Sequence, residues 1–343
     1  MRKIGFGIIG CGGISNYFHI PELKAIEEAD VIAVADVIEN RARVTAERFG
    51  IKYWYTDYTK LLERDDIDAV VVATPHPTHA KIAVDSINAG KHVIIQKPMC
   101  TNSRDAEMIV KAARKHSDVK VMVLPFVYFD TPSFDYAKKL LSSSGVGRVC
   151  MVRSRVAHAG PEGYQEGVAR MFGEEKNCWF FDPEKAHGGV LLDLGVYAVT
   201  QIVYLLGKVK SVLARVATLD KSAKVEDNCA LLMEMENGAI AVAESSWTQV
   251  ATVEGTILYG TKGTVLLNYF NIPVAFYDQK NASWVIPTVA REKEPQHTHR
   301  HFVRCLLNNS IPIGSPEEGK HVVEVIEAAY ESAASGKTIN LIS

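Results

Sequence analysis

The stretch IGFGIIGCGGIS, which spans residues 4–15, decides the fold of this chain. Its first six residues are apolar and predict a short buried strand. In the glycine-rich turn that follows, Gly10 allows the tight bend and Gly12 lets the main chain approach a pyrophosphate. The next helix would offer its positive N-terminus to the phosphates. Ser15 stands where a third glycine is usual, and its small side chain still allows helix and strand to pack closely.

A second strand strengthens this interpretation. The apolar run Val31–Asp36 ends in an acid 21 residues beyond Ser15, close to the ~20 residues expected for the carboxylate that binds an adenine ribose. A glycine turn alone could arise by chance, but strand, turn, helix and acid in this order predict a dinucleotide site. The residues predicted to bind the cofactor here are Gly10, Gly12, Gly13, Ile14, Asp36 and Arg41.

Asp36 also predicts which cofactor is used. Its carboxylate can accept both ribose hydroxyls of NAD, whereas the 2′-phosphate of NADP would place two negative charges close together. We therefore expect NAD, with NADP as the alternative because the guanidinium of Arg41 could reach a 2′-phosphate. A solvated residue of the helix is the interpretation we prefer for Arg41.

Strand and helix signals alternate through the first third of the chain. Strands are expected over residues 69–73, 92–96 and 119–124, and helices over residues 39–49, 78–89 and 103–116. The alternation and the Val- and Ile-rich strands predict a doubly wound parallel sheet, a Rossmann domain of the α/β class. We expect this dinucleotide-binding domain to comprise residues 1–124.

Two polar stretches follow predicted strands, at the sheet edge where ligands bind. Lys97 ends one strand, where a partly desolvated ammonium can stabilise a developing alkoxide. A solvated lysine before a turn proline is the alternative. The histidines of the other stretch could instead fill a turn and cap a helix. The predicted cofactor contacts at this edge are Thr74, Pro75, His76, His79, Gln96 and Lys97.

Beyond a linking helix, the pattern changes to alternating strands. The clearest pair, residues 230–236 and 239–246, is joined by Asn237-Gly238, a signal for a type I′ hairpin. Residues 125–343 therefore predict an α+β domain with a largely antiparallel, open-faced sheet, which binds the substrate and mediates oligomerisation. The predicted helices of this domain are enough to cover only one face of the sheet. We therefore expect the other face to be buried in a homodimer or homotetramer.

Within this domain, two glycines at residues 188–189 precede a predicted helix that carries Asp193 and Tyr197 at positions i and i+4, on one face. Asp193 could instead be an acid of the first helical turn, and Tyr197 a core aromatic residue. The preceding segment offers polar and aromatic side chains for a polyhydroxy substrate, each of which could also be framework. The residues predicted to bind the substrate are Lys97, His158, Trp179, Asp193 and Tyr197.

The composition excludes several other classes of function. The 343 residues carry 38 basic and 40 acidic side chains, a net charge of −2, so no basic field indicates nucleic acid or an anionic membrane. No apolar run reaches the ~18 residues of a membrane span. The six cysteines include no CxxC pair, which argues against a zinc cage or a disulfide framework and fits a reducing cytoplasm.

A histidine-rich stretch near the C-terminus raises the question of a metal. His297, His299 and His301 have no acid or cysteine that completes a ligand set. They are better read as the start of an amphipathic helix. No metal is expected.

With these motifs in view, the sequence resembles the Gfo/Idh/MocA family (glucose–fructose oxidoreductase, inositol dehydrogenase, rhizopine catabolism) almost from end to end. The resemblance rests on the glycine turn, Val34-Ala35-Asp36, Ala73-Thr74-Pro75, Gly90-Lys91-His92-Val93, Lys97-Pro98, Gly188-Gly189 and Asp193-Leu194-Gly195. It implies an N-terminal Rossmann domain, a C-terminal open-faced sheet and a nicotinamide cofactor. It also implies oxidation or reduction of a secondary alcohol on a sugar, polyol or related small molecule.

Three departures from the family pattern concern the expected site. The family usually reads Glu-Lys-Pro where this chain has Gln96-Lys97-Pro98, so Lys97 loses an ionic neighbour. Many members have a catalytic His at the position of Tyr197, whereas a branch resembling glucose–fructose oxidoreductase and dihydrodiol dehydrogenase has Tyr there. His187 stands in a run where three glycines are more usual.

The resemblance implies catalytic roles for Lys97, Tyr197 and Asp193. Tyr197 could accept the substrate proton as a phenolate favoured by Lys97, or Lys97 could be the base with Tyr197 only orienting. Asp193 would orient Lys97 or a second substrate hydroxyl. We expect an NAD(P)-dependent dehydrogenase or reductase acting on CH–OH groups. Redox-assisted glycoside cleavage and a non-catalytic dinucleotide-binding regulator of the same fold are the alternatives.

Overall fold

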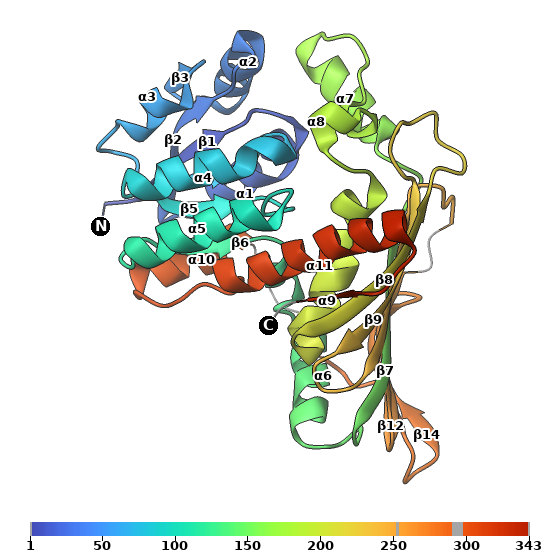
Figure 1. Ribbon diagram of the computed structural model, residues 1–343. Coiled ribbons are helices and arrows are strands. Elements are labelled where there is room, and N and C mark those ends of the chain that lie inside the picture. Colours follow the sequence, from blue (N-terminus) through green and yellow to red (C-terminus); the bar gives the residue numbers. More distant parts are fainter. Residues whose placement is uncertain (1, 252–253, 290–297, 342–343) are drawn as a thin grey trace.

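The computed structural model describes residues 2–251, 254–289 and 298–341 (Figure 1). The chain forms two sheets, one of six strands and one of nine. We call residues 2–124, which contain the six-stranded sheet, the first lobe, and residues 125–289 the second lobe. Two C-terminal helices, α10 (Thr298–Leu307) and α11 (Pro316–Ser335), follow the second lobe.

The six-stranded sheet is parallel throughout, in the order β3-β2-β1-β4-β5-β6. Its strands are β1 (Ile4–Ile9), β2 (Ala29–Ala35), β3 (Tyr53–Tyr55), β4 (Ala69–Val72), β5 (His92–Ile95) and β6 (Val121–Val123). The chain starts in the middle, runs outward to β3 and crosses back to β4. The carboxyl ends of β1 and β4 therefore meet at a switch point, where α/β folds bind ligands. The predicted doubly wound parallel sheet is confirmed.

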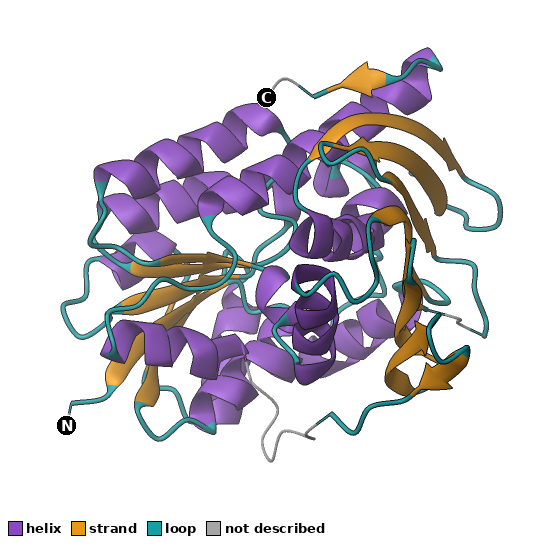
Figure 2. Cartoon of the chain, turned by 90° about the horizontal axis from the view of Figure 1, so that it is seen from below, coloured by secondary structure: helices purple, strands orange, loops and turns teal. Residues whose placement is uncertain are grey.

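Helices lie on both faces of this sheet (Figure 2). They are the π-helical turn η1 (Ser15–His19), α1 (Ile20–Lys24), α2 (Glu39–Phe49), α3 (Tyr58–Leu62), η2 (His76–Thr78), α4 (His79–Asn88) and α5 (Ser103–Lys115). The C-terminal helices complete both apolar layers. Phe302 of α10 packs in one cluster with Ile8 of β1, and Val323 of α11 packs in the other with Val72 of β4. The first lobe thus depends on the end of the chain for part of its core.

The nine-stranded sheet has the order β14-β13-β12-β11-β7-β10-β9-β8-β15. Its strands are β7 (Val149–Ala157), β8 (Val209–Ala217), β9 (Asn228–Met235), β10 (Ile240–Ser246), β11 (Gly255–Gly260), β12 (Gly263–Tyr269), β13 (Ile272–Asp278), β14 (Ser283–Val285) and β15 (Ile339–Asn340). Every pairing is antiparallel except that of β7 with β10. The predicted largely antiparallel sheet is confirmed.

The turn between β9 and β10 differs from the predicted type I′ hairpin. A type I′ turn needs a positive φ at both central residues, and only Gly238 has one, at 82°. The Gly238 N–H donates to the carbonyl of Met235, and the Met235 N–H donates to that of Ala239. The strands are therefore joined by a longer turn in which Gly238 alone takes the left-handed conformation.

Helices cover one face of the second sheet (Figure 1). The second lobe contains η3 (Phe126–Phe129), α6 (Pro132–Ser142), α7 (Glu162–Phe172), η4 (Trp179–Phe181), α8 (Pro183–Ala186), the π-helical turn η5 (Leu191–Gly195) and α9 (Val196–Leu206). Of these, α6 and α9 pack on the sheet together with α11, which also packs against α5 of the first lobe. No described helix covers the opposite face in Figure 1.

One helical segment of the second lobe resembles a membrane span in length and composition. It comprises 24 residues, Pro183–Leu206, which include α8, η5 and α9. Its most apolar part is 78% buried, and Leu191, Val199 and Ile202 belong to the core beneath the second sheet. Its hydropathy therefore has a sufficient explanation in core packing.

Candidate active site

The glycine turn has the shape that the sequence predicts. Gly10 has φ 97°, and a Cβ there would lie 2.5 Å from the carbonyl oxygen of Ala73, so only glycine fits. A Cβ on Gly12 would meet no atom within 4 Å, which leaves open space for a ligand beside the main chain. Helical conformation begins at Gly13 and continues through η1 and α1. The turn therefore fits the pyrophosphate of a dinucleotide.

Asp36 lies beside this turn, directly after β2. One carboxylate oxygen accepts a hydrogen bond from the Cys11 N–H (2.8 Å) and the other from the Ile38 N–H (2.9 Å). Burial raises the pKa of Asp36, although these two N–H groups act to lower it. The carboxylate is thus fixed at the place where the sequence predicts an adenine ribose.

Arg41, at the start of α2, is not a solvated helix residue. Its Nε and Nη2 donate to the two carboxylate oxygens of Glu174 at 2.7 and 2.5 Å. Glu174 follows α7 of the second lobe, and the Asn40 side-chain amide donates to the Phe172 carbonyl nearby (2.9 Å). The guanidinium beside Asp36 is therefore already occupied by an acid from the other lobe.

Helix α7 also lies over the glycine turn. A Cβ on Gly13 would be 2.5 Å from the Tyr164 hydroxyl and 2.5 Å from a methyl group of Val168. The rings of Tyr164 and Tyr17 meet edge to face, with centroids 6.0 Å apart. The second lobe thus reaches the predicted cofactor site of the first.

Lys97 and Asp193 meet between the lobes. The Lys97 ammonium donates to the Asp193 carboxylate and, at 2.8 Å, to the Asp193 main-chain carbonyl. The Trp247 indole N–H donates to the other carboxylate oxygen at 3.1 Å. The side chains of Lys97 and Asp193 are only 13% and 9% exposed. Burial acts to raise the pKa of Asp193, but the charge and hydrogen bond of Lys97 outweigh it and lower that pKa.

Tyr197 lies against the same ammonium. The Lys97 Nζ is 5.0 Å from the centre of its ring, and Tyr128 stacks on it with centroids 6.2 Å apart. Burial, followed by the Asp193 charge, raises the pKa of Tyr197 well above its ordinary value. This opposes the predicted phenolate, because the Lys97 charge is paired with Asp193 and does not offset the burial.

The π-helical turn η5 explains how Asp193 and Tyr197 are presented. An α-helix would run directly from the glycines into α9, but five residues here make i→i+5 turns. A Cβ on Gly189 would overlap the Glu226 carbonyl oxygen, and the Glu226 carboxylate accepts hydrogen bonds from the N–H groups of Gly189 and Leu191. The absence of a side chain at Gly189 therefore lets the loop that contains Glu226 approach and hydrogen-bond the start of the π-helical turn.

His76 lies with aromatic side chains of the second lobe. Its ring centroid is 5.0 Å from that of Trp179, which stacks on Phe180 at 4.1 Å. His76 is 5% exposed, and its Nδ1 has no hydrogen-bond partner among the described residues. This nitrogen is therefore a buried polar atom beside the aromatic side chains of the second lobe. His158 is half-buried, and its Nδ1 accepts a hydrogen bond from the Gly160 N–H (2.9 Å).

His79 joins two loops of the first lobe. Its Nδ1 lies 2.8 Å from the Pro98 carbonyl oxygen and its Nε2 lies 2.7 Å from that of Thr74. The Thr74 hydroxyl accepts a hydrogen bond from that of Thr78 (2.7 Å). Both partners are carbonyl oxygens, and burial lowers the pKa of His79, so the neutral ring donates its one N–H to either of them. His79 thus lies between the Thr74-Pro75 loop and the Lys97-Pro98 loop.

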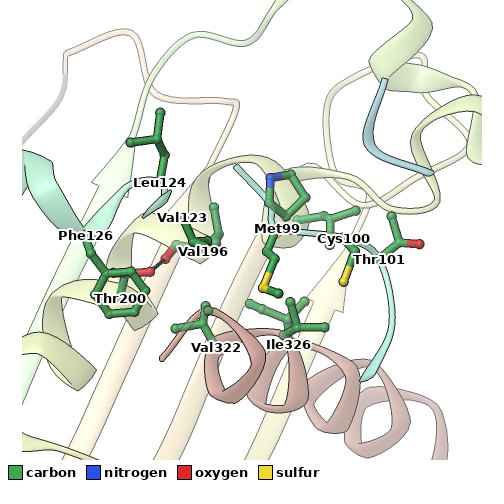
Figure 3. A pocket seen from close by; sticks show the side chains of 14 residues that line it. Met99, Cys100, Thr101, Val123, Leu124, Phe126, Val196, Thr200, Val322 and Ile326 are labelled. Carbon is green, nitrogen blue, oxygen red and sulfur yellow. Dashed lines mark hydrogen bonds between the residues drawn. The ribbon is translucent and has the colours of Figure 1, made fainter. Parts of the chain in front are cut away.

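A small apolar pocket lies beside the loop that follows Lys97 (Figure 3). The loop that starts at Pro98, helix α9 and helix α11 line it. The one hydroxyl that α9 contributes, Thr200, donates to the Val196 carbonyl (2.6 Å) and so is already paired. We interpret the pocket as a small gap in the apolar packing. The side chains around it hold the Lys97 loop against the helical run that carries Asp193.

The structure brings Lys97, Asp193 and Tyr197 together, as predicted, and adds residues that sequence reasoning missed. These are Trp247, Tyr128 and Glu174, none of which belongs to a local motif. Trp247 binds Asp193 across 54 residues of chain, and Glu174 binds Arg41 across 133. Only the three-dimensional fold reveals such pairs. Among the described residues, no group of three His, Cys, Asp or Glu could hold a metal; His297 lies outside them.

Two family models match the chain. The model described as "Oxidoreductase family, NAD-binding Rossmann fold" matches residues 4–124, and the "GFO/IDH/MocA C-terminal domain" matches residues 134–266. The first match ends at residue 124 and the second begins at residue 134.

Characterised relatives and solved structures agree with these models. D-xylose 1-dehydrogenase (NADP(+)) 2 of Haloferax volcanii is 29% identical over 341 residues, 98% of this chain and 99% of that protein. Myo-inositol 2-dehydrogenase of Thermotoga maritima is 24% identical over 347 residues, 98% of each chain. The crystal structure of GenD2 from gentamicin A biosynthesis in complex with NAD has a TM-score of 0.82 and 28% identity, covering 100% of this chain and 97% of that one.

The glycine turn, the lysine at the end of β5 and the matches to both parts of the chain lead to one assignment. This protein belongs to the Gfo/Idh/MocA family of NAD(P)-binding oxidoreductases.

Proposed function

We propose that this protein is a reversible NAD(P)-dependent dehydrogenase acting on a secondary alcohol of a sugar, a polyol or a related small molecule. The convergence of Lys97, Asp193 and Tyr197 between the lobes carries this proposal. A nicotinamide supplies the hydride acceptor when it is bound. The residues of the chain have to orient the carbinol carbon and move one proton.

Lys97 is the better candidate for the proton-handling group. In the reductive direction its ammonium would give a proton to the substrate carbonyl oxygen, and in the oxidative direction the neutral amine would take the proton back. Asp193 and Trp247 hold it in place. Tyr197 keeps its proton because burial raises its pKa, so it would donate a hydrogen bond to the same oxygen.

The predicted cofactor residues all follow strands of the parallel sheet, namely β1, β2, β4 and β5. Gly10, Gly12, Gly13 and Ile14 would hold the pyrophosphate and Asp36 the adenine ribose, which favours NAD. The loops after β4 and β5 would hold the nicotinamide end through Thr74, Pro75, His76, Gln96 and Lys97. His79 would support these loops from behind. We propose that residues 1–124 bind the cofactor and that residues 125–343 bind the substrate and mediate assembly.

The substrate class follows from the groups that surround Lys97. The unpaired Nδ1 of His76 and the half-buried ring of His158 offer polar contacts, and Trp179 offers a flat apolar face. Several hydroxyls on a small ring would match this mixture. The names of the xylose and inositol dehydrogenases among the relatives support a carbohydrate or polyol.

The open face of the second sheet supports a homo-oligomer. Its exposed large side chains include Met151, Leu232, Ile240, Tyr259 and Trp284. Between them, Arg153 and Arg155 both bind Glu244. An apolar face with internally paired charges suits association with a second copy, as a dimer or tetramer. The six cysteines are all free thiols, which supports the reducing cytoplasm as its location.

A substrate panel tests the proposed reaction. The protein is incubated with NAD⁺ or NADP⁺ and with aldoses, inositols, sugar acids and aryl glycosides, while reduced nicotinamide and released aglycone are both followed. We expect reduced nicotinamide to accumulate with at least one free sugar or polyol. Aglycone release without net reduction would instead support glycoside cleavage. Cofactor binding without turnover of any compound would support a regulator.

A further inference from the structure

A chain of buried side chains runs from the main chain of Lys97 to a carboxylate of α1. The Lys97 N–H donates to Gln96 Oε1 at 2.6 Å, and Gln96 Nε2 lies 3.1 Å from His19 Nε2. His19 Nδ1 lies 2.9 Å from His299 Nε2, and His299 Nδ1 lies 2.6 Å from Glu22 Oε2. The chain links the end of β5 to η1, α10 and α1.

Every polar member of this chain is shielded from water. His19 and His299 are fully buried and Gln96 is 5% exposed, while the Glu22 side chain is 13% exposed. Burial, followed by His299, lowers the pKa of His19 well below its ordinary value. His19 is therefore best accommodated as a neutral imidazole. We take the equally buried His299 as neutral too, so that each ring has one N–H and one acceptor nitrogen.

The carboxylate fixes the direction of all four hydrogen bonds. An ionised Glu22 can only accept, so His299 must carry its proton on Nδ1 and accept at Nε2. His19 must then donate from Nδ1 and accept at Nε2. That acceptor requires the amide N–H₂ of Gln96, which leaves the amide oxygen for Lys97. Donors and acceptors match at every step.

We infer that this one-way chain holds the Gln96 amide in a single orientation, and that Gln96 is thereby a positioning residue for Lys97. The amide oxygen anchors the main chain at the residue whose ammonium meets Asp193. The positioning role rests on the proposed function, whereas the direction of the chain does not.

The chain also explains why this protein has glutamine at position 96. A glutamate there would place a carboxylate at each end of the chain. Three N–H groups would then be needed from His19 and His299, which supply two when both are neutral. One buried proton would have to be added, on a ring or on the introduced carboxylate itself. Glutamine avoids this by donating from its own amide.

Exchanging the glutamine at position 96 and the glutamate at position 22 tests the direction of the chain. Gln96→Glu should bind one extra proton in the folded protein at neutral pH and lose it as the pH rises. The pKa of the new carboxyl would be higher in the folded than in the unfolded state. The variant should therefore lose stability as the pH rises from the unfolded-state pKa to the folded-state pKa. The unfolding equilibrium constant relative to wild type should change by about tenfold per pH unit in that window.

The compensating change is Glu22→Gln. With both substitutions the chain can run backwards, from the new amide at position 22 through His299 and His19 to the new carboxylate at position 96, with both rings neutral again. The extra pH dependence should then disappear. Gln165→Glu is the matched control, because Gln165 is a buried glutamine of α7 outside the chain. Glu22→Gln should not rescue the stability of that variant.

Other groups face the chain and have to be followed in the same experiment. The Tyr128 phenol faces Gln96 and Thr298, which both act to lower its pKa, and Phe18 packs against both His19 and His299. Burial raises the pKa of Tyr128 well above its ordinary value, so this phenol stays protonated across the neutral range. Lys97 and Glu22 are the charged groups at the two ends.

Nitrogen NMR of the histidine-labelled full-length protein reads the direction directly. We expect His19 and His299 to be neutral, with the proton on Nδ1, and not to titrate between about pH 6 and pH 9. In the double variant the proton should move to Nε2 on both rings. An Nε2 proton or an imidazolium on either ring of the wild type would overturn the inference, as would failure of Glu22→Gln to rescue Gln96→Glu.

The positioning role of Gln96 is tested separately, by enzyme kinetics. With a substrate found by the panel, Gln96→Glu should lower kcat at alkaline pH more than it weakens NAD binding, and the double variant should restore kcat. Normal kcat in a variant with a disrupted chain would refute the positioning role alone. Absence of turnover in the wild type would refute the proposed function and leave the NMR result standing.

Discussion

The Lys97 ammonium donates to both the side chain and the main-chain carbonyl of Asp193, although 96 residues separate the two in sequence. One residue ends a strand of the first lobe and the other belongs to a π-helical turn of the second. Their pairing therefore depends on how the lobes sit against each other. The Trp247 indole holds the remaining oxygen of the same carboxylate. Any change that separates the lobes should disturb proton transfer before it disturbs either fold.

Replacement of Lys97 should abolish most activity. Lys97→Met removes the proton-handling group while keeping the length of the side chain, so kcat should fall by about 10²–10⁴. NAD affinity, measured by calorimetry, should stay within a few-fold. Lys91→Met is the matched control, since Lys91 lies at the other end of β5 and donates to the carbonyls of Arg64 and Ile67. Near-wild-type turnover of Lys97→Met would remove Lys97 from the mechanism.

The same substitution should reverse the sign of a pH effect on stability. In the wild type Lys97 lowers the pKa of Asp193, so this contribution is present at neutral pH and is lost as the pH falls through that pKa. In the Lys97→Met variant the lowering by Lys97 is gone, so burial should raise the pKa of Asp193. A carboxyl with a raised pKa in the folded state makes the protein less stable as the pH rises. Leaving the carboxylate unpaired should cost about 3–5 kcal/mol at neutral pH.

A second substitution separates this stability effect from catalysis. Lys97→Met combined with Asp193→Asn removes the unpaired charge, so denaturant unfolding should recover most of the lost stability while activity remains low. If the double variant is as unstable as the single one, the ion pair is not what stabilises this seam.

Substitution of Tyr197 distinguishes proton transfer by Lys97 from proton transfer by a Tyr197 phenolate. Because burial raises its pKa, we expect the phenol to stay protonated and Tyr197→Phe to keep the shape of the wild-type pH–rate profile. The kcat should fall through loss of one hydrogen bond to the substrate, by roughly tenfold for about 1.4 kcal/mol. Disappearance of an alkaline rise in kcat would show instead that the phenolate is the base.

Local patterns in the sequence were sufficient for most of the first lobe. The run from β1 through Gly10 to Asp36 could be predicted because burial, a positive φ and strand spacing are properties of neighbouring residues. The edge strand Tyr53–Tyr55 could not, because its three residues are only partly buried and show no clear period. Helix α7 was also missed. Its residues serve contacts with the other lobe more than a local core.

The candidate site shows the same division. Lys97 could be placed because it lies two residues beyond an apolar strand, and Asp193 and Tyr197 because they follow two glycines. The π-helical turn between the glycines and α9 has no sequence signature of its own. The long-range partners could not be predicted. Trp247 reaches Asp193 across 54 residues of the second lobe, and Glu174 of the second lobe reaches Arg41 of the first, so both contacts exist only in the folded chain.

Assembly should depend on the open face of the second sheet. Leu232 and Ile240, on adjacent strands β9 and β10, are about half-exposed there. Leu232→Asp combined with Ile240→Asp should convert the oligomer into monomers, which light scattering at micromolar concentration would detect. Leu307→Asp, at a similarly exposed leucine of α10, should leave the assembly unchanged. A wild-type protein that is already monomeric would disprove the proposed oligomer.

Cofactor choice should depend on three charged residues that meet across the lobes. The Asp36 carboxylate would repel a 2′-phosphate, and Glu174 occupies the Arg41 guanidinium that could otherwise bind it. Asp36→Ser should therefore raise kcat/KM for NADP by one to two orders of magnitude, on the order of 1.4–2.8 kcal/mol, and weaken NAD. If the wild type already prefers NADP, Asp36 is not the discriminating residue.

Glu174→Gln tests the contribution of the second lobe to that choice. The substitution removes the charge that neutralises Arg41, so the guanidinium can turn toward a 2′-phosphate. Calorimetry with 2′,5′-ADP and ADP isolates this effect from turnover, and the variant should bind 2′,5′-ADP roughly tenfold more tightly, about 1.4 kcal/mol. Glu175→Gln, at the exposed neighbouring acid, is the control. In the Asp36→Ser background the gain should be larger, because one guanidinium would then face the phosphate without a competing carboxylate. Equal binding of both nucleotides to Glu174→Gln and to the wild type would show that Arg41 does not face the ribose.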